Sequence, residues 1–201
     1  MRVVVVSGLS GSGKSVALHM LEDLGFYCID NIPAALLTPL ISHTVRSADS
    51  TYERIAVGLD ARNTAAEIAT VPKLLQELKK SGIPCEVLFL TANDGELLRR
   101  FAETRRKHPM SRSDVGLREA IAIERDLLEP IMYAAAQVID TSRMDQIIEI
   151  NSRDMYVVAQ VGVTWARLNE ALQAQGLRAP FYGPFSGLAA TVGGSLSQNS
   201  V

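Results

Sequence analysis

The sequence predicts an α/β fold in which helices cover both faces of a parallel sheet. Short apolar runs alternate with longer amphipathic stretches five times before residue 143. This alternation is typical of a doubly wound sheet with right-handed crossovers. The first run, Val3–Val6, is continuous and β-branched, as expected of a strand that is buried on both faces. A glycine-rich turn and an amphipathic helix follow it, so the chain opens with the order strand, loop, helix.

The turn at residues 8–15 fits the phosphate-binding pattern G-x-x-x-x-G-K-[ST]. Glycines let the backbone approach phosphate oxygens, and successive N–H groups form an anion nest at the positive end of the next helix. In this pattern Lys14 reaches the β- and γ-phosphates, and the Ser15 hydroxyl holds Mg²⁺. The sequence thus predicts a kinase-like P-loop NTPase fold with a five-stranded sheet. The predicted ATP-binding residues are Gly8, Leu9, Ser10, Gly11, Ser12, Gly13, Lys14 and Ser15.

The other elements follow from hydrophobic periodicity and from helix and turn signals. Further sheet strands are expected at 26–29, 54–59, 85–90 and 138–142. Helices are expected at 16–24, 34–46 and 65–80, after residue 94, and at 117–136 with Pro130 as a candidate kink. Beyond residue 143 a strand at 156–161 and a helix from Thr164 to Gly176 are expected.

Two acidic residues end predicted strands and are alternative candidates to support the metal. Asp30 ends the second strand and Asp60 ends the third. Ligands gather at the carboxyl ends of parallel strands, so both aspartates are placed near the phosphates. Asp30 can equally be a turn-forming residue ahead of Pro33. The sequence does not separate Asp30 from Asp60 for the magnesium role.

The residues after Asp60 have two interpretations. Arg62 and Asn63 are placed to face a nucleotide base or phosphate. Alternatively, Asn63 and Thr64 cap the helix that follows. Both interpretations stay open at the level of sequence.

The outer side and the end of the helix after residue 94 are expected to be strongly basic, with Arg99, Arg100, Arg105, Arg106 and Lys107. In phosphoryl-transfer folds such a segment closes over the nucleotide and neutralises developing charge. The alternative is a solvated basic helix face. Pro109 and the loop at 111–116 make a lid as well supported as the solvated face, and in a lid Arg105 or Arg106 would contact the γ-phosphate. The candidate catalytic residues are therefore Lys14, Asp30, Asp60, Arg105 and Arg106.

Composition narrows the class of protein. The formal net charge of −2 over 201 residues provides no global basic field for nucleic acid or acidic membranes. Cys28 and Cys85 lie far apart, which is typical of a reduced cytosolic protein. The histidines are scattered and suggest no metal site. No apolar run is long enough to span a bilayer, and we expect no signal peptide, hence a cytoplasmic protein without a membrane partner.

Residues 1 to about 143 resemble the N-terminal domain of the RapZ/YvcJ family of P-loop nucleotide-binding proteins. The segments that carry the resemblance are 7–18, 21–23, 25–33, 60–63, 98–100, 104–109, 126–130 and 139–142. The resemblance implies weak ATPase and GTPase activity, with ATP bound at Gly8–Ser15. It implies a GTP-associated segment at Asp60, Ala61, Arg62 and Asn63. Thr91 is a departure, because the family pattern leads us to expect an acid after the fourth strand.

The resemblance also implies a different class of function. Some family members act as adapters that present a small regulatory RNA to a ribonuclease. A nucleotide-switched, non-enzymatic adapter with a protein or small-RNA partner is therefore the alternative to an enzyme. Family members continue into a C-terminal domain that carries RNA binding, whereas this sequence changes character near Met144. We therefore expect RNA binding of the family, not of this chain.

Residues 147–201 resemble a fragment of the FAD-binding domain of glycolate-oxidase-like, FAD-linked oxidases. The segments that carry this resemblance are 162–165 and 190–194, which in that family help to hold the flavin pyrophosphate. The first flavin-binding loop is absent from this stretch, so we expect no working FAD site. An FAD-linked oxidoreductase fragment is the second alternative. The predicted domains are 1–143 and 144–201, the latter a partial α+β appendage with a mobile tail at 183–201.

Overall fold

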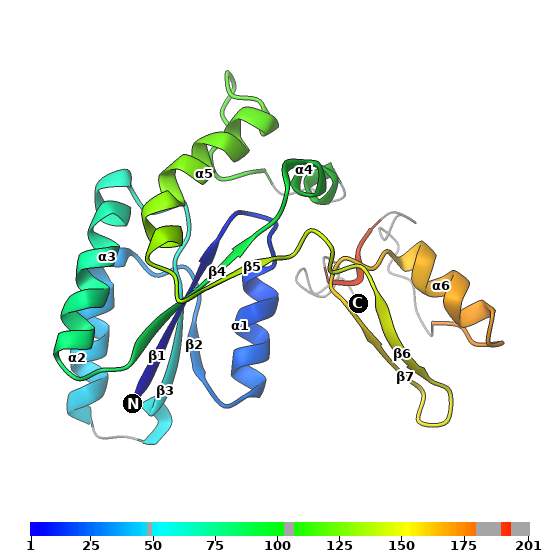
Figure 1. The fold of residues 1–201 in the computed structure, drawn as a ribbon, viewed down its shortest axis with the longest axis horizontal. Helices are drawn as coiled ribbons and strands as arrows, with labels where there is room; N and C mark the ends of the chain where they lie inside the picture. Colours follow the sequence, from blue (N-terminus) through cyan, green and yellow to red (C-terminus); the bar gives the residue numbers. More distant parts are fainter. Residues whose placement is uncertain (48–49, 103–106, 180–189, 194–201) are drawn as a thin grey trace.

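The computed structural model describes residues 1–47, 50–102, 107–179 and 190–193. Its main body is a five-stranded parallel sheet in the order β2-β3-β1-β4-β5 (Figure 1). The expected doubly wound α/β fold is confirmed. The strands are β1 (Arg2–Gly8), β2 (Tyr27–Ile29), β3 (Arg54–Gly58), β4 (Cys85–Thr91) and β5 (Gln137–Asp140).

Helices cover both faces of this sheet, as Figure 1 shows. Helix α1 (Lys14–Asp23) lies on one face, and α2 (Leu37–Ser47), α3 (Ala65–Lys80) and α5 (Leu117–Tyr133) lie on the other. Helix α4 (Asp94–Ala102) follows β4 at the carboxyl edge of the sheet. Short 3₁₀ turns occur at Ala34–Leu36 and Ser50–Tyr52. Among the described residues, none of the helices has the length and apolar character needed to cross a membrane.

Strand β1 is the centre of the core because apolar side chains leave it in both directions. Val3 and Val5 belong to the large apolar cluster beneath α3 and α5. Val4 and Val6 belong to the smaller cluster beneath α1, together with Leu18. Successive side chains of a strand point to opposite faces. A central strand with covered faces therefore requires the continuous apolar run seen in the sequence.

Both ends of α3 and the start of α5 lie at the predicted residues, whereas the other predicted ends are shifted by one to three residues. The side chain of Thr64 accepts a hydrogen bond from the Glu67 amide (3.3 Å), and the Glu67 carboxylate accepts one from the Thr64 amide (2.9 Å). This capping box starts α3 at the predicted residue, Ala65. Pro130 lies inside α5, which runs through it and ends at Tyr133, earlier than predicted. The helix predicted over 34–46 begins as the 3₁₀ turn Ala34–Leu36.

The expected α+β appendage is confirmed beyond β5. It contains an antiparallel hairpin of β6 (Ile147–Asn151) and β7 (Tyr156–Ala159), followed by α6 (Trp165–Gln173). The sequence analysis missed β6. Val163, Leu168 and Leu172 are buried in a small core of their own against the hairpin. Most of the predicted mobile tail, 183–201, lies outside the described residues.

The parallel pairing of β1 with β4 brings Leu90 so close to position 8 that only glycine fits there. Gly8 has φ +142°, and a Cβ there would lie 2.0 Å from the carbonyl oxygen of Leu90. We expect Gly8→Ala to lower the free energy of unfolding by about 3 kcal/mol, because overpacking and backbone strain add. Urea denaturation measures the loss. Gly25→Ala is the control, since Gly25 has φ +81° but open space around it. We expect about 1 kcal/mol there, and equal losses would contradict the packing argument.

Candidate functional site

The P-loop, residues 8–15, joins β1 to α1 at the carboxyl edge of the sheet. Part of its backbone is tied into the fold: the Leu9 amide donates to Leu90 O (3.1 Å), and the Ser12 amide donates to Leu9 O (3.0 Å). Gly11 and Gly13 have φ of +84° and +104°, a region that favours glycine. The loop amides that have no acceptor among the described residues are those of Gly11, Gly13, Lys14 and Ser15.

Three of these amides are consecutive: Gly13 is the N-cap residue of α1, and Lys14 and Ser15 are its first two residues. The first amides of a helix have no partner within the helix, and they carry its positive partial charge. Backbone groups of this kind bind anions, phosphate above all. The loop therefore has the donor pattern that the sequence predicted for phosphate binding.

The Lys14 side chain folds back over the loop. Its Nζ donates to Gly8 O (2.7 Å) and to Leu9 O (3.1 Å). A carbonyl oxygen is a weaker partner for an ammonium group than a charged phosphate is. Lys14 can therefore exchange these contacts for a phosphate that enters the loop.

Burial lowers the pKa of Lys14, while the negative charges of Glu124, Asp60 and Asp30 act to raise it. The tertiary fold has thus gathered three carboxylates around one ammonium group. Two of them, Asp30 and Asp60, are the residues that the sequence offered for the magnesium role. Glu124 was not among the predicted site residues.

Glu124 holds the loop from the side of α5. Its Oε2 accepts from the Ser10 amide (2.8 Å), and its Oε1 accepts from the Ser10 hydroxyl (2.6 Å). His108 Nε2 lies 3.0 Å from Oε2. The Met110 amide donates to His108 Nδ1 (3.1 Å), so the ring proton is on Nε2 and points at the carboxylate. Glu124 is fully buried, and His108 is nearly so.

Burial alone would raise the pKa of Glu124. The hydrogen bond from His108, the nearby charge of Lys14 and the two donors of Ser10 outweigh that effect and lower the pKa below its ordinary value of 4.5. Glu124 is therefore a carboxylate anion inside the protein. A buried charge of this kind requires the partners that it has.

Arg100 holds the loop from the side of α4. Its Nη1 donates to Gly11 O (2.8 Å) and to the Thr141 hydroxyl (3.0 Å), and its Nε donates to Glu96 (2.9 Å). The Thr141 hydroxyl in turn lies 3.1 Å from Ser12 O. Only 11% of the Arg100 side chain is exposed. This corrects the expectation that Arg100 belongs to the outer basic side of its helix.

The structure describes only some of the other basic residues that were candidates for contact with the nucleotide. Arg105 and Arg106, the predicted γ-phosphate contacts, lie outside the described residues. Lys107 follows them and is exposed. Arg99 pairs with Glu96 on the same helix. The predicted lid over the nucleotide is therefore left as a prediction.

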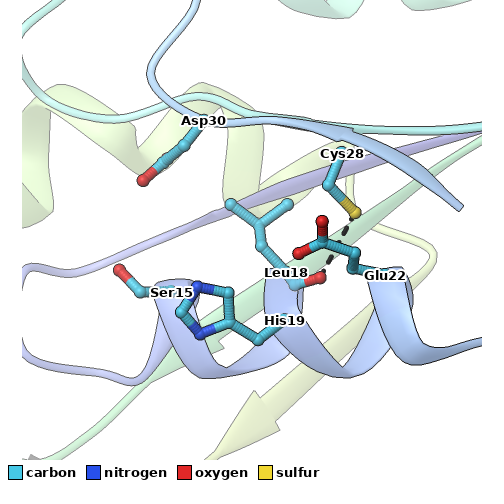
Figure 2. A pocket seen from close by; sticks show the side chains of 6 residues that line it. All are labelled: Ser15, Leu18, His19, Glu22, Cys28 and Asp30. Carbon is cyan, nitrogen blue, oxygen red and sulfur yellow. Dashed lines mark hydrogen bonds between the residues drawn. The ribbon is translucent and has the colours of Figure 1, made fainter. Parts of the chain in front are cut away.

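A cavity of about 140 Å³ opens beside the first turns of α1. Figure 2 shows Asp30 and Ser15 on opposite sides of it. The Asp30 carboxylate packs on β3, because a Cβ at Gly58 would lie 2.6 Å from its Oδ1. The lining residues are Ser15, Leu18, His19, Glu22, Cys28 and Asp30.

Asp60 is buried and already has partners. Its Oδ1 accepts from the Arg62 amide (2.9 Å), and its Oδ2 pairs with the Arg62 guanidinium (3.5 Å). Asn31 donates to Oδ1 (2.9 Å) in the amide orientation that satisfies its neighbours. Asp60 thus organises the turn after β3 as well as contributing negative charge near Lys14.

The remaining members of the predicted GTP segment differ in exposure. Ala61 is in the apolar core, and Asn63 is buried. The Asn63 side chain accepts from the Ala34 amide (2.6 Å) and donates to Asp60 O (3.2 Å), which ties two loops together. Arg62 is the member of the segment with an exposed side chain, at 59%.

The oxygen donors near the loop suit Mg²⁺. Ser15 offers a hydroxyl and Asp30 a carboxylate across the same cavity, with Asp60 nearby. Mg²⁺ prefers such hard oxygen ligands, and it is usually held by one or two protein groups together with substrate phosphates. Among the described residues, no cluster of three or more His, Cys, Asp or Glu could hold a metal without a ligand. The residues present fit a metal that arrives with a nucleotide.

Comparison with known proteins agrees with this geometry. Residues 1–154 match the model of the RapZ-like N-terminal domain. The chain belongs to this family. A nucleotide-binding protein of Methylococcus capsulatus is 49% identical over 142 residues, which cover 71% of this chain and 48% of that protein. One from Halorhodospira halophila is 52% identical over 143 residues, covering 71% and 50%. The chain spans about half the length of these curated relatives.

A second family model matches the other end of the chain. Residues 128–201 are similar to an FAD binding domain. This range overlaps the RapZ-like match and contains β6, β7 and α6. The backbone of the predicted flavin segment at 162–165 leads into α6, where Thr164 caps the helix by accepting from the Arg167 amide (3.3 Å). Much of the second predicted flavin segment, 190–194, is described, and Val192 N donates to Val163 O (2.8 Å).

Sequence reasoning missed Glu124, Arg100 and Thr141 as supports of the RapZ-like P-loop. A signal for Glu124 was present, because it occupies the apolar stripe of α5 between Ile121 and Leu128. A charged residue in a buried stripe is rare unless it is paired. Arg100 and Thr141 do not interrupt an apolar stripe in this way, so the sequence carried no signal that they contact the loop.

Acid should expose the contribution of Glu124 to stability. Its pKa in the folded state lies below the ordinary value of 4.5. The carboxylate therefore stabilises the fold above that pH, and the contribution is lost as the pH falls through the folded-state pKa. We expect Glu124→Gln to lose less stability than the wild type as the pH falls from about 6 to about 3.5, because the variant has no carboxylate to protonate. Urea denaturation at both pH values tests this, and identical losses would rule it out.

Proposed function

We propose that this RapZ-like chain binds ATP or GTP as the Mg²⁺ complex through residues 8–15 and hydrolyses it slowly. The observation that carries the proposal is the set of four amides without an acceptor among the described residues, at Gly11, Gly13, Lys14 and Ser15, next to a half-buried lysine. Amides grouped in this way on a glycine-rich turn before a helix, with a lysine beside them, are suited to bind a phosphate chain. The printed names of the relatives, nucleotide-binding proteins, support the same class of ligand.

In the proposed complex the protein groups have separate tasks. The loop amides bind the β-phosphate, and the Lys14 ammonium leaves Gly8 O and Leu9 O to contact the β- and γ-phosphates. Ser15 and Asp30 hold Mg²⁺, directly or through water, with Asp60 behind them. Mg²⁺ supplies charge neutralisation for the phosphates. The proposed contact of Arg105 or Arg106 with the γ-phosphate rests on the sequence alone.

We attribute slow hydrolysis to the hydrogen bonds that the carboxylate nearest the loop already makes with the protein. Glu124 is the buried carboxylate that touches the loop, and Ser10 and His108 occupy it. A carboxylate bound in this way is poorly placed to orient an attacking water. The proposed activity is therefore weak ATP or GTP hydrolysis. For guanine nucleotides, the exposed Arg62 is the proposed contact within residues 60–63.

A nucleotide-switched adapter is the second candidate function, and one chain of contacts favours it. Arg100 and Thr141 touch the loop, and the Met144 amide donates to Thr141 O (3.3 Å). The Gly162 amide donates to Met144 O (2.7 Å) in the appendage. A change in the loop could thus reach residues beyond 143. We place either activity in the cytoplasm, in keeping with the unpaired Cys28 and Cys85.

Removing the lysine tests nucleotide binding directly. We expect Lys14→Ala to weaken binding of Mg²⁺-ATP and Mg²⁺-GTP roughly 100-fold, because about 2–3 kcal/mol of charge-assisted hydrogen bonding is lost. Isothermal titration calorimetry on the full chain measures the dissociation constants. Lys73→Ala is the control, since Lys73 is exposed on α3 and pairs only weakly with Glu77. Unchanged affinity in Lys14→Ala would refute the proposal.

The metal role can be assigned by comparing two matched variants. We expect Asp30→Asn to weaken the Mg²⁺ dependence of nucleotide binding about tenfold, because Asp30 shares the cavity with Ser15. Asp60→Asn should cost less in Mg²⁺ affinity and more in stability, since its partners are Arg62 and Asn31. Titration of nucleotide binding with Mg²⁺ and urea denaturation separate the two effects. The reverse order would assign the metal to Asp60.

A further inference from the structure

The Glu124 carboxylate lies directly against the P-loop. It contacts the third residue of the loop, Ser10, through both the amide and the hydroxyl. The loop amides without an acceptor among the described residues begin at the next residue, Gly11. Two donors of the loop, the amide and the hydroxyl of Ser10, are thus already bound to a protein anion instead of being open to a ligand.

Glu124 is also the strongest negative influence on Lys14, ahead of Asp60 and Asp30. Lys14 is the side chain that reaches the β- and γ-phosphates in a loop of this type. A terminal phosphate that contacts Lys14 therefore comes close to the Glu124 carboxylate. Like charges at short range in a site with little water repel strongly.

The carboxylate cannot turn away from the incoming charge. Glu124 is fully buried in the middle of α5, and His108 fixes its Oε2 from the other side. The His108 ring packs against Phe101 with the ring centroids 5.0 Å apart. Phe101 would in turn be 3.4 Å from a Cβ at Gly11. The anion, its histidine and the loop are therefore packed together as one unit.

We infer that Glu124 is a specificity-determining residue whose charge disfavours the terminal phosphate, so that the loop prefers a nucleoside diphosphate to a triphosphate. This inference rests on the proposed nucleotide binding and sharpens it to a ligand class. The diphosphate uses the free amides from Gly11 onward and stays clear of Glu124. The triphosphate gains contacts with Lys14 but meets the fixed carboxylate.

Glutamine at position 124 isolates the effect of charge. One amide oxygen can accept from the Ser10 amide and from His108 Nε2, as Oε2 does now. The amide nitrogen can donate to the Ser10 hydroxyl, which accepts as well as donates. Glu124→Gln thus keeps the geometry and removes the negative charge. Glu129→Gln is the matched control, because Glu129 is an exposed carboxylate on the same helix.

The test compares dissociation constants of the full 201-residue chain for Mg²⁺-ATP and Mg²⁺-ADP by calorimetry. In Glu124→Gln we expect the ratio Kd(ATP)/Kd(ADP) to fall at least about fivefold, with the ADP constant little changed. Glu129→Gln should leave the ratio as in the wild type. The same pair of measurements with Mg²⁺-GTP and Mg²⁺-GDP extends the test to guanine nucleotides.

An unchanged ratio in a folded Glu124→Gln protein would overturn the inference. Equal weakening of both nucleotides would also overturn it, since Glu124 would then only support the loop. If the variant does not fold, the wild type carries the test: it should bind Mg²⁺-ADP more tightly than Mg²⁺-ATP, and a dissociation constant for ATP equal to or below that for ADP refutes the preference. Failure of the wild type to bind any of these nucleotides would instead reject the proposed function itself, and the inference with it.

Discussion

The conformation of the P-loop depends on side chains elsewhere in the domain that hydrogen-bond its backbone and the Ser10 hydroxyl. Glu124 takes the amide and hydroxyl of Ser10, and Arg100 and Thr141 hold the carbonyls of Gly11 and Ser12. Unsatisfied backbone groups in a buried loop are costly, so a flexible glycine-rich turn would otherwise satisfy them within itself. Because these atoms are held from outside, the amides of Gly11, Gly13, Lys14 and Ser15, which have no acceptor among the described residues, are left for a ligand.

Those supports come from three different elements, none of them adjacent to the loop in sequence. Glu124 lies in α5, Arg100 in α4, and Thr141 in the turn after β5. Each is held in place by the sheet: β4 pairs with β1 on one side and with β5 on the other. The geometry of the phosphate site is therefore a property of the whole folded domain. A phosphate site on a separate loop could not be held to the same precision.

The charges of the site explain why binding and turnover need not go together. Lys14 is surrounded by Glu124, Asp60 and Asp30, and its burial makes it depend on their charge. A phosphate chain with its metal can replace part of that arrangement, whereas Glu124 keeps its own partners. In the function and the ligand preference that we propose, the buried carboxylate that stabilises the loop is also the group that limits which nucleotide binds and how fast it is hydrolysed.

The sequence by itself determined the P-loop, the central buried strand and the start of α3, because each depends on a short pattern: glycine spacing, a β-branched run, and the Thr64–Glu67 capping box. It also placed Asp30 and Asp60 at one edge of the sheet. Only the tertiary structure decided that Arg100 faces the loop, that Asn63 is buried, and that Glu124 meets Ser10 across 114 positions of the chain. Contacts at that separation depend on how helices pack on the sheet, and no local pattern in the sequence encodes that packing.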